Sequence, residues 1–515
     1  MSAQAEQTRF ARAQHAAFEL VLAAGWIPAI IVVATGITVG FFAWYAVALQ
    51  VHRPSFVQFS LLVLLAAGLL LVPWAWLTYS RYLSSRTGIL YERALRYDAI
   101  SWAPMLLLWL AFILPVSITR GGTELLLFCV ALFCTAKIVV AARFNETVRD
   151  VTVDFIVSRV AIIVIAELAA LIIGQRAGVH AQESHNLLLA VWGRWDAVHY
   201  IDIATIGYHG TDMAFFPLYP LLIKALGALT GNHLIAGVII SNVALYFGLL
   251  YLYKLIEHEF ERPVARRAIF YISIFPTAIF FSAVYPESLF LMLTVASFYY
   301  IRERRWWLAG AIGLFAALTR VEGVLLVVPF MIEWFVAHLP ALRSGERAQW
   351  SRAVLDFLPI LLIPVGLGLY MTYLWVLNGD PLYFSHVQIN WNRHLAAPWT
   401  AVMNSIHKIQ HSTSPQTVAN QILELVFTAL MIGVLLGGWR RLKASYIAYL
   451  ALSILLPMST SSLMSMPRFA LVLFPMFAIL ALWGRRPSVN NAIVALSLPL
   501  LGLFTVLFAD WYWVA

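Results

Sequence analysis

The chain has 515 residues, of which 62% are hydrophobic and only 11% are charged. Soluble proteins contain about 45–50% apolar and about 25% charged residues, and a soluble fold of this length has too little interior to hide the excess. The composition therefore excludes a cytosolic enzyme, a secreted domain and a disordered chain, and it predicts a polytopic membrane protein. The formal charge of +9 comes from small basic clusters scattered between apolar runs, so no nucleic-acid-binding surface is indicated.

Apolar runs long enough to cross a bilayer recur along the whole chain and predict an all-α fold, because helices pair their own backbone groups inside lipid. Spanning takes about 20 residues, and about fifteen runs qualify. About four of them, near 22–48, 57–79, 99–117 and 122–142, are expected to form a multi-span N-terminal extension over residues 1–150. About eleven more are expected in a core over residues 151–515, near 155–175, 233–256, 268–283, 286–301, 306–319, 321–338, 353–377, 419–437, 444–458, 468–483 and 489–511. The first run is longer than a signal-peptide core and lacks a clear cleavage site, so we expect it to stay in the protein.

One segment, Phe215–Leu229, decides the expected topology. It is apolar but short, and it contains Pro217, Pro220 and Lys224. If it does not cross, 22 arginines and lysines fall on one side of the membrane, against roughly nine on the other. If it crossed, the basic clusters would split between both sides. We therefore expect a re-entrant or interfacial helix here, a cytoplasmic N-terminus and an extracytoplasmic C-terminus.

This topology places two long loops outside the cytoplasm, near 176–232 and 379–418. Both are rich in aromatic, histidine, asparagine and charged residues, whereas the inner loops are short and basic. Long structured loops are where binding and catalytic residues usually lie. Function is therefore expected on the outer face, with a structured first outer loop.

The first outer loop contains the stretch WGRWDAVHYIDIATIGYHGTDMAFFPLYPLL. On a helix, Asp196, His199 and Tyr200 would share one face, and a carboxylate beside a histidine at a membrane surface is suited to act as a general base. The alternative is an anchoring belt built around Trp192 and Trp195, with Asp196 a solvated charge. On composition alone the anchoring role is the better supported of the two.

Further polar groups stand at the expected outer ends of later spans. They are Tyr285, Glu287, Arg320 beside Glu322, Arg393 beside His394, and Arg468. Arginines on the outer face run against the positive-inside trend, and their forked guanidinium groups suit phosphate or carboxylate partners. Each arginine can alternatively pair with a nearby acid, as Arg320 can with Glu322.

Motifs for bound cofactors are missing from the sequence. GxGxxG after a strand, GxxxxGK[ST], HExxH and CxxC do not occur, so a phosphate loop for a nucleotide donor is not indicated. Asp202, Asp212 and Glu287 can in principle join Asp196 around a divalent cation, since Mg²⁺ and Mn²⁺ prefer oxygen ligands. This site is not the favoured interpretation, and the expectation is that there is no metal and no cofactor.

At these residues the sequence resembles the PIG-V-like mannosyltransferases, integral-membrane glycosyltransferases of the GT-C class. The similarity runs from about residue 155 to the C-terminus. The matching stretches are RWDAVHYIDIATIGY, AFFPLYPLL, FSAVYPESLFLMLT, GLFAALTRVEGVLL, GDPLYFSHVQINWNRHLAAPW and MPRFALVLFP.

The resemblance implies a GT-C-like helical core and an inverting transfer of mannose, or a similar hexose, from a polyprenyl-phosphate sugar. The acceptor would be a glycan, a lipid or a protein outside the cytoplasm. Asp196 takes the position of the presumed catalytic base. The residues expected to bind substrate are Arg194, Trp195, His199, Tyr200, Tyr285, Glu287, Arg320, Arg393, His394 and Arg468.

Two alternatives stay open at this point. A transporter or flippase of lipid-linked saccharides would bind the same ligand with the same outer-face residues, and a catalytically dead scaffold would bind it without moving it. Arginine-rich, lysine-poor loops fit a multi-pass protein of a bacterial plasma membrane.

Overall fold

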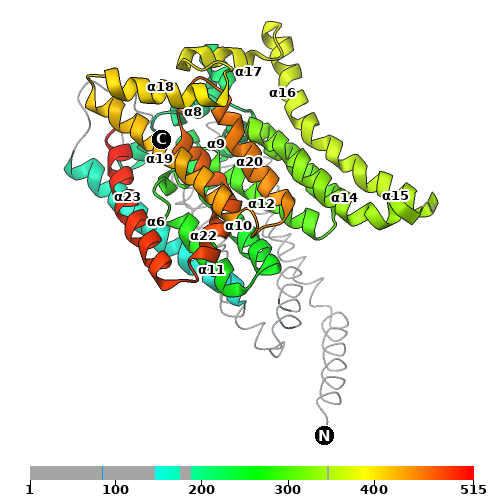
Figure 1. The fold of residues 1–515 in the computed structure, drawn as a ribbon. Helices are drawn as coiled ribbons and strands as arrows, with labels where there is room; N and C mark the ends of the chain where they lie inside the picture. The colour runs from blue at the N-terminus through cyan, green and yellow to red at the C-terminus, as the bar shows by residue number, and fades with distance from the viewer. Residues whose placement is uncertain (1–79, 81–83, 85–144, 174–186, 345–346, 515) are drawn as a thin grey trace, which may run out of the picture. The chain divides into compact units, whose positions relative to one another are not determined.

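In the computed structural model, the described part of the chain comprises residues 80, 84, 145–173, 187–344 and 347–514. From α6 onward it is built of helices, and among the described residues the one β-type pairing is an isolated bridge between Leu395 and Thr460 (Figure 1). The expected all-α fold is confirmed. The expected N-terminal extension over residues 1–150 falls almost entirely outside the described residues.

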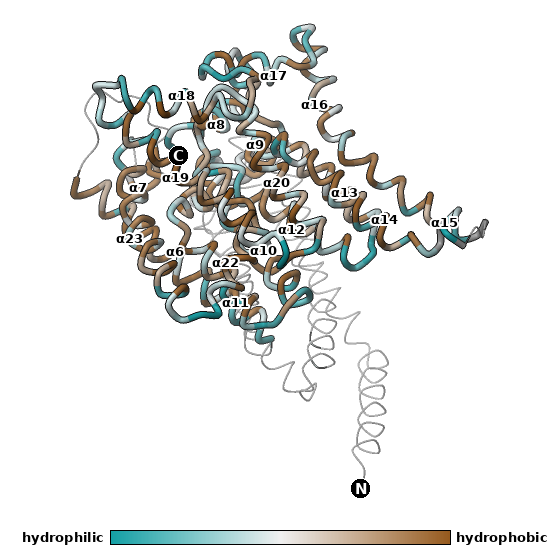
Figure 2. Tube along the Cα trace, viewed as in Figure 1, coloured by the Kyte–Doolittle hydropathy of each residue, from teal (hydrophilic) through white to brown (hydrophobic). Residues whose placement is uncertain are grey.

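Six helical stretches in the described part of the chain are long and apolar enough to cross a membrane. They are α6 (Glu146–Ile172), α10 (His233–Glu259), Val321–Pro340 leading through η5 (Val321–Leu326) into α14 (Val327–Ser344), Gln349–Asn378 from α15 (Arg347–Phe357) through η6 (Leu358–Leu361) into α16 (Leu362–Asn378), α19 (Pro415–Gly438) and α23 (Pro487–Ala509). In Figure 2 most of these helices are largely brown, whereas α15 also carries hydrophilic residues. Large apolar side chains remain exposed on them, for example Val157 at 64% and Val376 at 79%. Such faces fit contact with lipid, as the composition requires.

The expected span near 468–483 is bent. It consists of α21 (Met466–Val472) and α22 (Phe474–Trp483), whose axes differ by 75°. Pro475 follows the break, and proline disfavours a helical conformation in the residue before it and cannot continue the hydrogen-bond ladder.

The expected helical span near 268–283 is wrong. The helix α11 (Arg262–Ser273) ends before Pro276, and the chain continues through turns that include η4 (Ala278–Phe281). This irregular backbone is buried, and the guanidinium group of Arg159 donates to the carbonyls of Ser273 (3.1 Å) and Ala278 (2.9 Å). Non-helical backbone is tolerated at membrane depth where protein groups satisfy it in this way.

Three further expected runs form helices close to the predicted bounds, but shorter than the six long stretches. These are α12 (Glu287–Arg302), α13 (Trp306–Thr319) and α20 (Ala444–Met458), with 16, 14 and 15 residues. Their neighbours pack tightly against them: a Cβ added at Gly310 of α13 would lie 2.2 Å from the carbonyl oxygen of Pro359. Glycine is required there by the close approach of the two backbones.

The basic loops gather at one end of the core. Glu259 pairs with Arg302 (2.5 Å) and Lys443 (2.8 Å), and Glu261 pairs with Arg485 (2.9 Å). These ion pairs connect the loops that follow α10, α12, α19 and α22. The basic clusters that contain Arg302, Lys443 and Arg485, which the sequence places on one side of the membrane, therefore lie near one another.

The first long loop is structured, as expected. It contains α7 (Leu187–Ala190), η2 (Val191–Gly193), α8 (Ala197–Ile206), η3 (Gly210–Ala214) and α9 (Leu218–Thr230). With 13 residues, α9 is too short to span a bilayer. It packs beside α10, where the Tyr219 hydroxyl lies 2.7 Å from the Ser241 hydroxyl.

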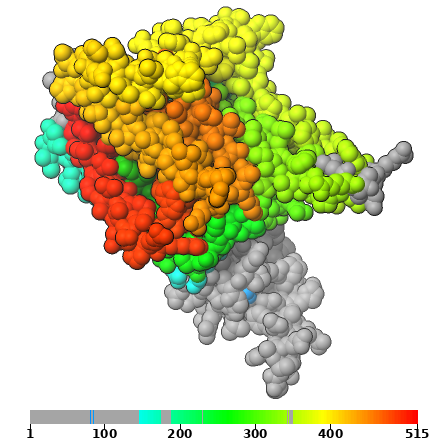
Figure 3. Space-filling view, viewed as in Figure 1, coloured from blue at the N-terminus to red at the C-terminus, as the bar shows by residue number. Residues whose placement is uncertain are grey.

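The second long loop covers the same end of the core as the first. It forms α17 (Tyr383–His386), η7 (Val387–Trp391) and α18 (Pro398–His411), and η7 packs against η3 of the first loop. In the space-filling view α18, in yellow, covers this end beside the red helix α23 (Figure 3). Both loops, the start of α21 and the end of α23 thus come together, away from the basic end.

Candidate active site

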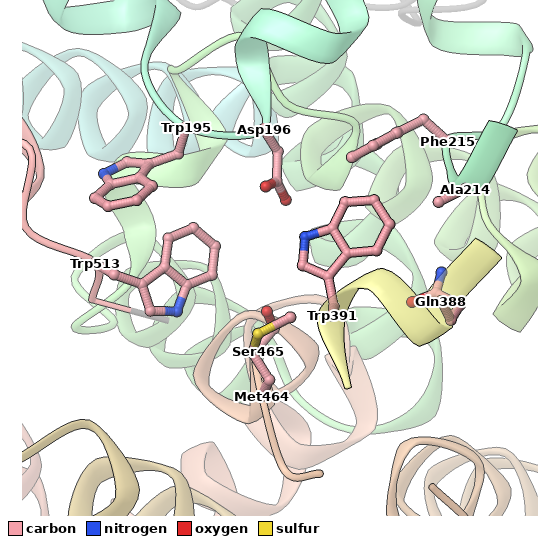
Figure 4. Close-up of a pocket in the computed structure, with 9 residues that line it drawn as sticks. All are labelled: Trp195, Asp196, Ala214, Phe215, Gln388, Trp391, Met464, Ser465 and Trp513. Carbon is pink, nitrogen blue, oxygen red and sulfur yellow. The ribbon is translucent and has the colours of Figure 1, made fainter. Parts of the chain in front are cut away.

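A cavity of about 300 Å³ lies where these four segments meet (Figure 4). The first loop, the second loop, the turn before α21 and the C-terminal segment all contribute to its wall. Its lining residues are Trp195, Asp196, Ala214, Phe215, Gln388, Trp391, Met464, Ser465 and Trp513. In Figure 4 the Asp196 carboxylate lies between Trp391 on one side and Trp195 with Trp513 on the other.

The backbone around Asp196 is held by Tyr285. Asp196 directly precedes α8, and its backbone N–H donates to the Tyr285 hydroxyl at 3.1 Å, while that hydroxyl donates to the Arg194 carbonyl at 3.0 Å. The tyrosine side chain is fully buried. The stretch FSAVYPES therefore fixes the stretch RWD, and the Asp196 side chain, 25% exposed, faces the cavity.

Left-handed backbone conformations gather around the cavity. Five non-glycine residues of the described chain have positive φ, and four of them lie at the cavity. Trp195 (59°) and Ser465 (73°) line it, Asn392 (53°) directly follows the lining residue Trp391, and Trp511 (63°) contacts Trp195. Bulky residues rarely adopt this conformation, and where it occurs it is concentrated at functional sites. These locally strained backbone conformations set the directions of the side chains around the cavity.

Asp196 belongs to a buried chain of ion pairs. Arg468 donates from Nη1 to Asp196 Oδ2 at 2.6 Å, and from Nε and Nη2 to Glu287 Oε1 at 3.0 and 2.8 Å. Arg320 donates from Nη1 to the same Glu287 oxygen at 2.8 Å and from Nη2 to Glu322 Oε1 at 3.2 Å. Three carboxylates thus share two guanidinium groups, and Glu287, at their centre, is completely buried.

Arg468 is held rigidly in this chain. Besides Glu287, three aromatic rings surround its guanidinium group, with centroids 4.7 Å away for Tyr285, 5.2 Å for Phe280 and 5.8 Å for Trp513. Cation–π contacts of this kind add to the ion pairs. The interpretation that outer-face arginines pair with acids therefore applies to Arg320 and Arg468.

Arg393 differs from the other two arginines. It donates to the Met464 carbonyl, but no carboxylate of the described chain lies within ion-pairing distance, and its buried Nε has no hydrogen-bond partner. Burial lowers the pKa of Arg393. Met464, which anchors it, lines the cavity together with Asp196. This guanidinium group is thus the one of the three without a carboxylate of the described chain within ion-pairing distance, and Glu424 and Glu322 act on it only from further away.

The remaining predicted residues lie around the cavity rather than in its lining. His199 Nδ1 lies 2.7 Å from Asp212 Oδ1, and the His199 ring stacks on Phe215. Tyr200 is buried against Phe215. His394 pairs with the Ser461 hydroxyl at 3.2 Å.

Arg194 is buried behind the cavity, with none of its guanidinium nitrogens hydrogen-bonded and with the Trp511 ring 5.3 Å away. Burial lowers the pKa of Arg194 to about 10, against the opposing charge of Asp510.

Residues 164–376 match the mannosyltransferase (PIG-V) family. The match confirms the family resemblance and contains Asp196, Tyr285, Glu287 and Arg320, whereas Arg468 lies beyond it. No curated protein matches the sequence. A crystal structure of the oligosaccharyltransferase of Archaeoglobus fulgidus in the apo form aligns with 68% of this chain at 13% identity and a TM-score of 0.34. The alignment covers 55% of that protein, so the chain spans about half of its length.

Most of the aromatic residues that form the cavity wall were not predicted from the sequence. Trp391, Trp513 and Phe215 line the cavity. Trp511 lies behind the lining residue Trp195, with the two ring centroids 5.7 Å apart. Trp391 lies inside the stretch that carries the PIG-V resemblance, which was a usable signal. Trp513 lies in the terminal WYWV sequence, which is equally typical of an aromatic belt at a membrane interface.

The carboxylates considered for a divalent cation do not converge. Asp212 pairs with His199, and Arg468 lies between Asp196 and Glu287. Within the described residues, no three acidic, histidine or cysteine side chains are grouped as metal ligands. The positive charge between Asp196 and Glu287 is supplied by the guanidinium group of Arg468.

Proposed function

We propose that the protein is a membrane glycosyltransferase that moves mannose, or a similar hexose, from a polyprenyl-phosphate donor to an acceptor outside the cytoplasm. The observation that carries the proposal is the position of Asp196. Its carboxylate faces an aromatic-walled cavity, next to buried arginines, inside the stretch that matches a mannosyltransferase family.

The proposed reaction is a single inverting displacement. Asp196 accepts the proton of an acceptor hydroxyl while that oxygen forms a bond to the anomeric carbon of the sugar. The bond from this carbon to the phosphate oxygen breaks on the opposite face, and its electron pair leaves with the polyprenyl phosphate. The proton on Asp196 then passes to solvent.

The arginines supply the positive charge that the leaving phosphate requires. Donors fixed in place before the reaction stabilise developing charge without a cost of reorganisation. We assign this role to Arg393 and to the Nη1 group of Arg468, which faces the cavity and donates to Asp196 in the structure. Arg320 donates to Glu287 and Glu322 instead. Arg320 then serves to hold Glu287 and, through it, Arg468.

A lipid-linked donor accounts for two further features. The sequence has no phosphate loop for a nucleotide sugar, and the cavity lies at the end of the core away from the basic loops. If those loops are cytoplasmic, following the positive-inside rule, the cavity opens on the extracytoplasmic side, where the C-terminus also lies. A bacterial plasma membrane is the setting that we propose.

Transfer and transport can be separated with one preparation. Purified full-length protein in liposomes would be incubated with polyprenyl-phosphate mannose carrying a radiolabelled sugar, together with a membrane extract as the source of acceptor. A labelled product other than the donor or free mannose is the expected result. Movement of the labelled lipid between leaflets without such a product would instead establish a flippase. The absence of both a product and lipid movement would indicate a scaffold.

A further inference from the structure

We infer that Asp196 and the donor phosphate compete for Nη1 of Arg468, so that binding of the donor releases Asp196 from its ion pair before it acts on the acceptor. The inference rests on the proposed function and concerns the order of events within that site. It follows from the unequal ways in which the two partners of the Asp196–Arg468 pair are held.

Arg468 is the fixed partner. Its Nε and Nη2 both donate to the completely buried Glu287, and Tyr285, Phe280 and Trp513 surround its plane. These contacts leave only the Nη1 side directed toward the cavity, where it meets Asp196. A guanidinium group anchored in this way changes partners at Nη1 without moving.

Asp196 is the partner that can be displaced. Its side chain is a quarter exposed and lines the cavity, and the 2.6 Å contact with Arg468 occupies Oδ2. While this charge-assisted hydrogen bond lasts, Oδ2 is held at Arg468 and only Oδ1 is left for an acceptor hydroxyl. The arrangement seen in the structure is thus a resting one.

Arg393 supplies the second half of a phosphate site. It reaches the cavity wall through Met464, its Nε is buried without a partner, and its charge is not matched by a carboxylate of the described chain within ion-pairing distance. Guanidinium groups bind phosphate through strong, charge-assisted and often bidentate hydrogen bonds. A phosphate drawn to Arg393 can therefore take over Nη1 of Arg468 and release Asp196.

The test measures binding of a short-chain polyprenyl phosphate, the leaving group without its sugar, so that no turnover occurs. Isothermal titration calorimetry would compare the full-length protein in detergent with Asp196→Asn and Arg393→Gln. Asp202→Asn is the matched control, because Asp202 lies in α8 six residues after Asp196 and is not part of the cavity lining.

We expect Asp196→Asn to bind the lipid phosphate about tenfold more tightly, as the ligand no longer has to replace a charge-assisted hydrogen bond. Arg393→Gln should bind at least about tenfold more weakly, and Asp202→Asn should match the wild type. Equal or weaker binding by Asp196→Asn would overturn the inference. Asp196→Ala provides the same comparison if the asparagine variant does not fold.

The result is independent of the test of the proposed function. Sugar transfer by the wild type, combined with unchanged binding by Asp196→Asn, would refute the competition and leave the enzyme assignment intact. Tighter binding by Asp196→Asn without any transfer by the wild type would refute the enzyme assignment and retain the competition for Arg468.

Discussion

Replacement of Glu287 by glutamine tests whether Glu287 is the centre of the ion-pair chain. Glu287 Oε1 accepts three hydrogen bonds, two from Arg468 (3.0 and 2.8 Å) and one from Arg320 (2.8 Å), and the side chain is completely buried. Glutamine keeps the shape of the side chain but removes its charge. Two buried guanidinium groups then lose their shared counter-charge.

The expected loss of stability is large because the unpaired charges stay buried. Removing one partner of a buried ion pair costs about 3–5 kcal/mol, and each hydrogen bond to a charged group contributes about 1.5–3 kcal/mol. The amide oxygen of the substituted glutamine retains part of this bonding, so we expect a loss of about 3 kcal/mol in the free energy of unfolding. Glu322→Gln is the matched control, because Glu322 accepts only from Arg320, at 3.2 and 3.4 Å. For this control we expect about half of that loss.

Thermal unfolding of the purified variants in one detergent gives the comparison. The expected order of melting temperature is wild type, then Glu322→Gln, then Glu287→Gln. A Glu287→Gln protein that melts at the wild-type temperature, or above Glu322→Gln, would refute the central position of Glu287 in the chain of charges.

Three further changes test the site itself. Tyr285→Phe removes the hydroxyl that bridges Arg194 and Asp196. At roughly 1 kcal/mol for each of the two hydrogen bonds lost, the transfer rate should fall by up to about thirtyfold in a folded protein; an unchanged rate would show that the bridge does not position Asp196. Trp391→Ala should raise the KM of transfer several-fold, whereas Trp391→Phe, which keeps an aromatic face in the cavity wall, should change it little; equal effects would argue against a role for the ring. Transfer should continue in EDTA, because the guanidinium group of Arg468 already lies between Asp196 and Glu287; a loss of activity that Mg²⁺ or Mn²⁺ restores would contradict this.

The sequence was informative about the helices because lipid imposes one simple requirement. Apolar runs of about 20 residues had to form helices. The helices α10, α19 and α23 appear close to their predicted positions, whereas α6 begins at Glu146, before the predicted start at residue 155. The same rule failed near 268–283, where Pro276 ends the helix. Hydropathy alone did not reveal that the buried Arg159 would satisfy the irregular backbone there, since that contact joins residues more than a hundred positions apart.

The charged residues of the site were predicted from the sequence, but the ion pairs between them were not. Asp196, Glu287, Arg320 and Arg468 were all singled out from the sequence, and the structure joins them in one chain of ion pairs. The link between Asp196 and Arg468 spans 272 residues, so spacing along the chain carried no sign of it. The different state of Arg393 was equally hidden, because the distance from a guanidinium group to its nearest carboxylate is a property of the folded protein alone.

The most direct test of the central claim compares sugar transfer by the wild type, Asp196→Asn and Asp202→Asn, reconstituted in liposomes with polyprenyl-phosphate mannose. General-base catalysis contributes about 10²–10⁴-fold, so Asp196→Asn should lose at least about a hundredfold in rate while Asp202→Asn stays near the wild type. An Asp196→Asn protein that transfers the sugar at the wild-type rate would remove this carboxylate from the mechanism.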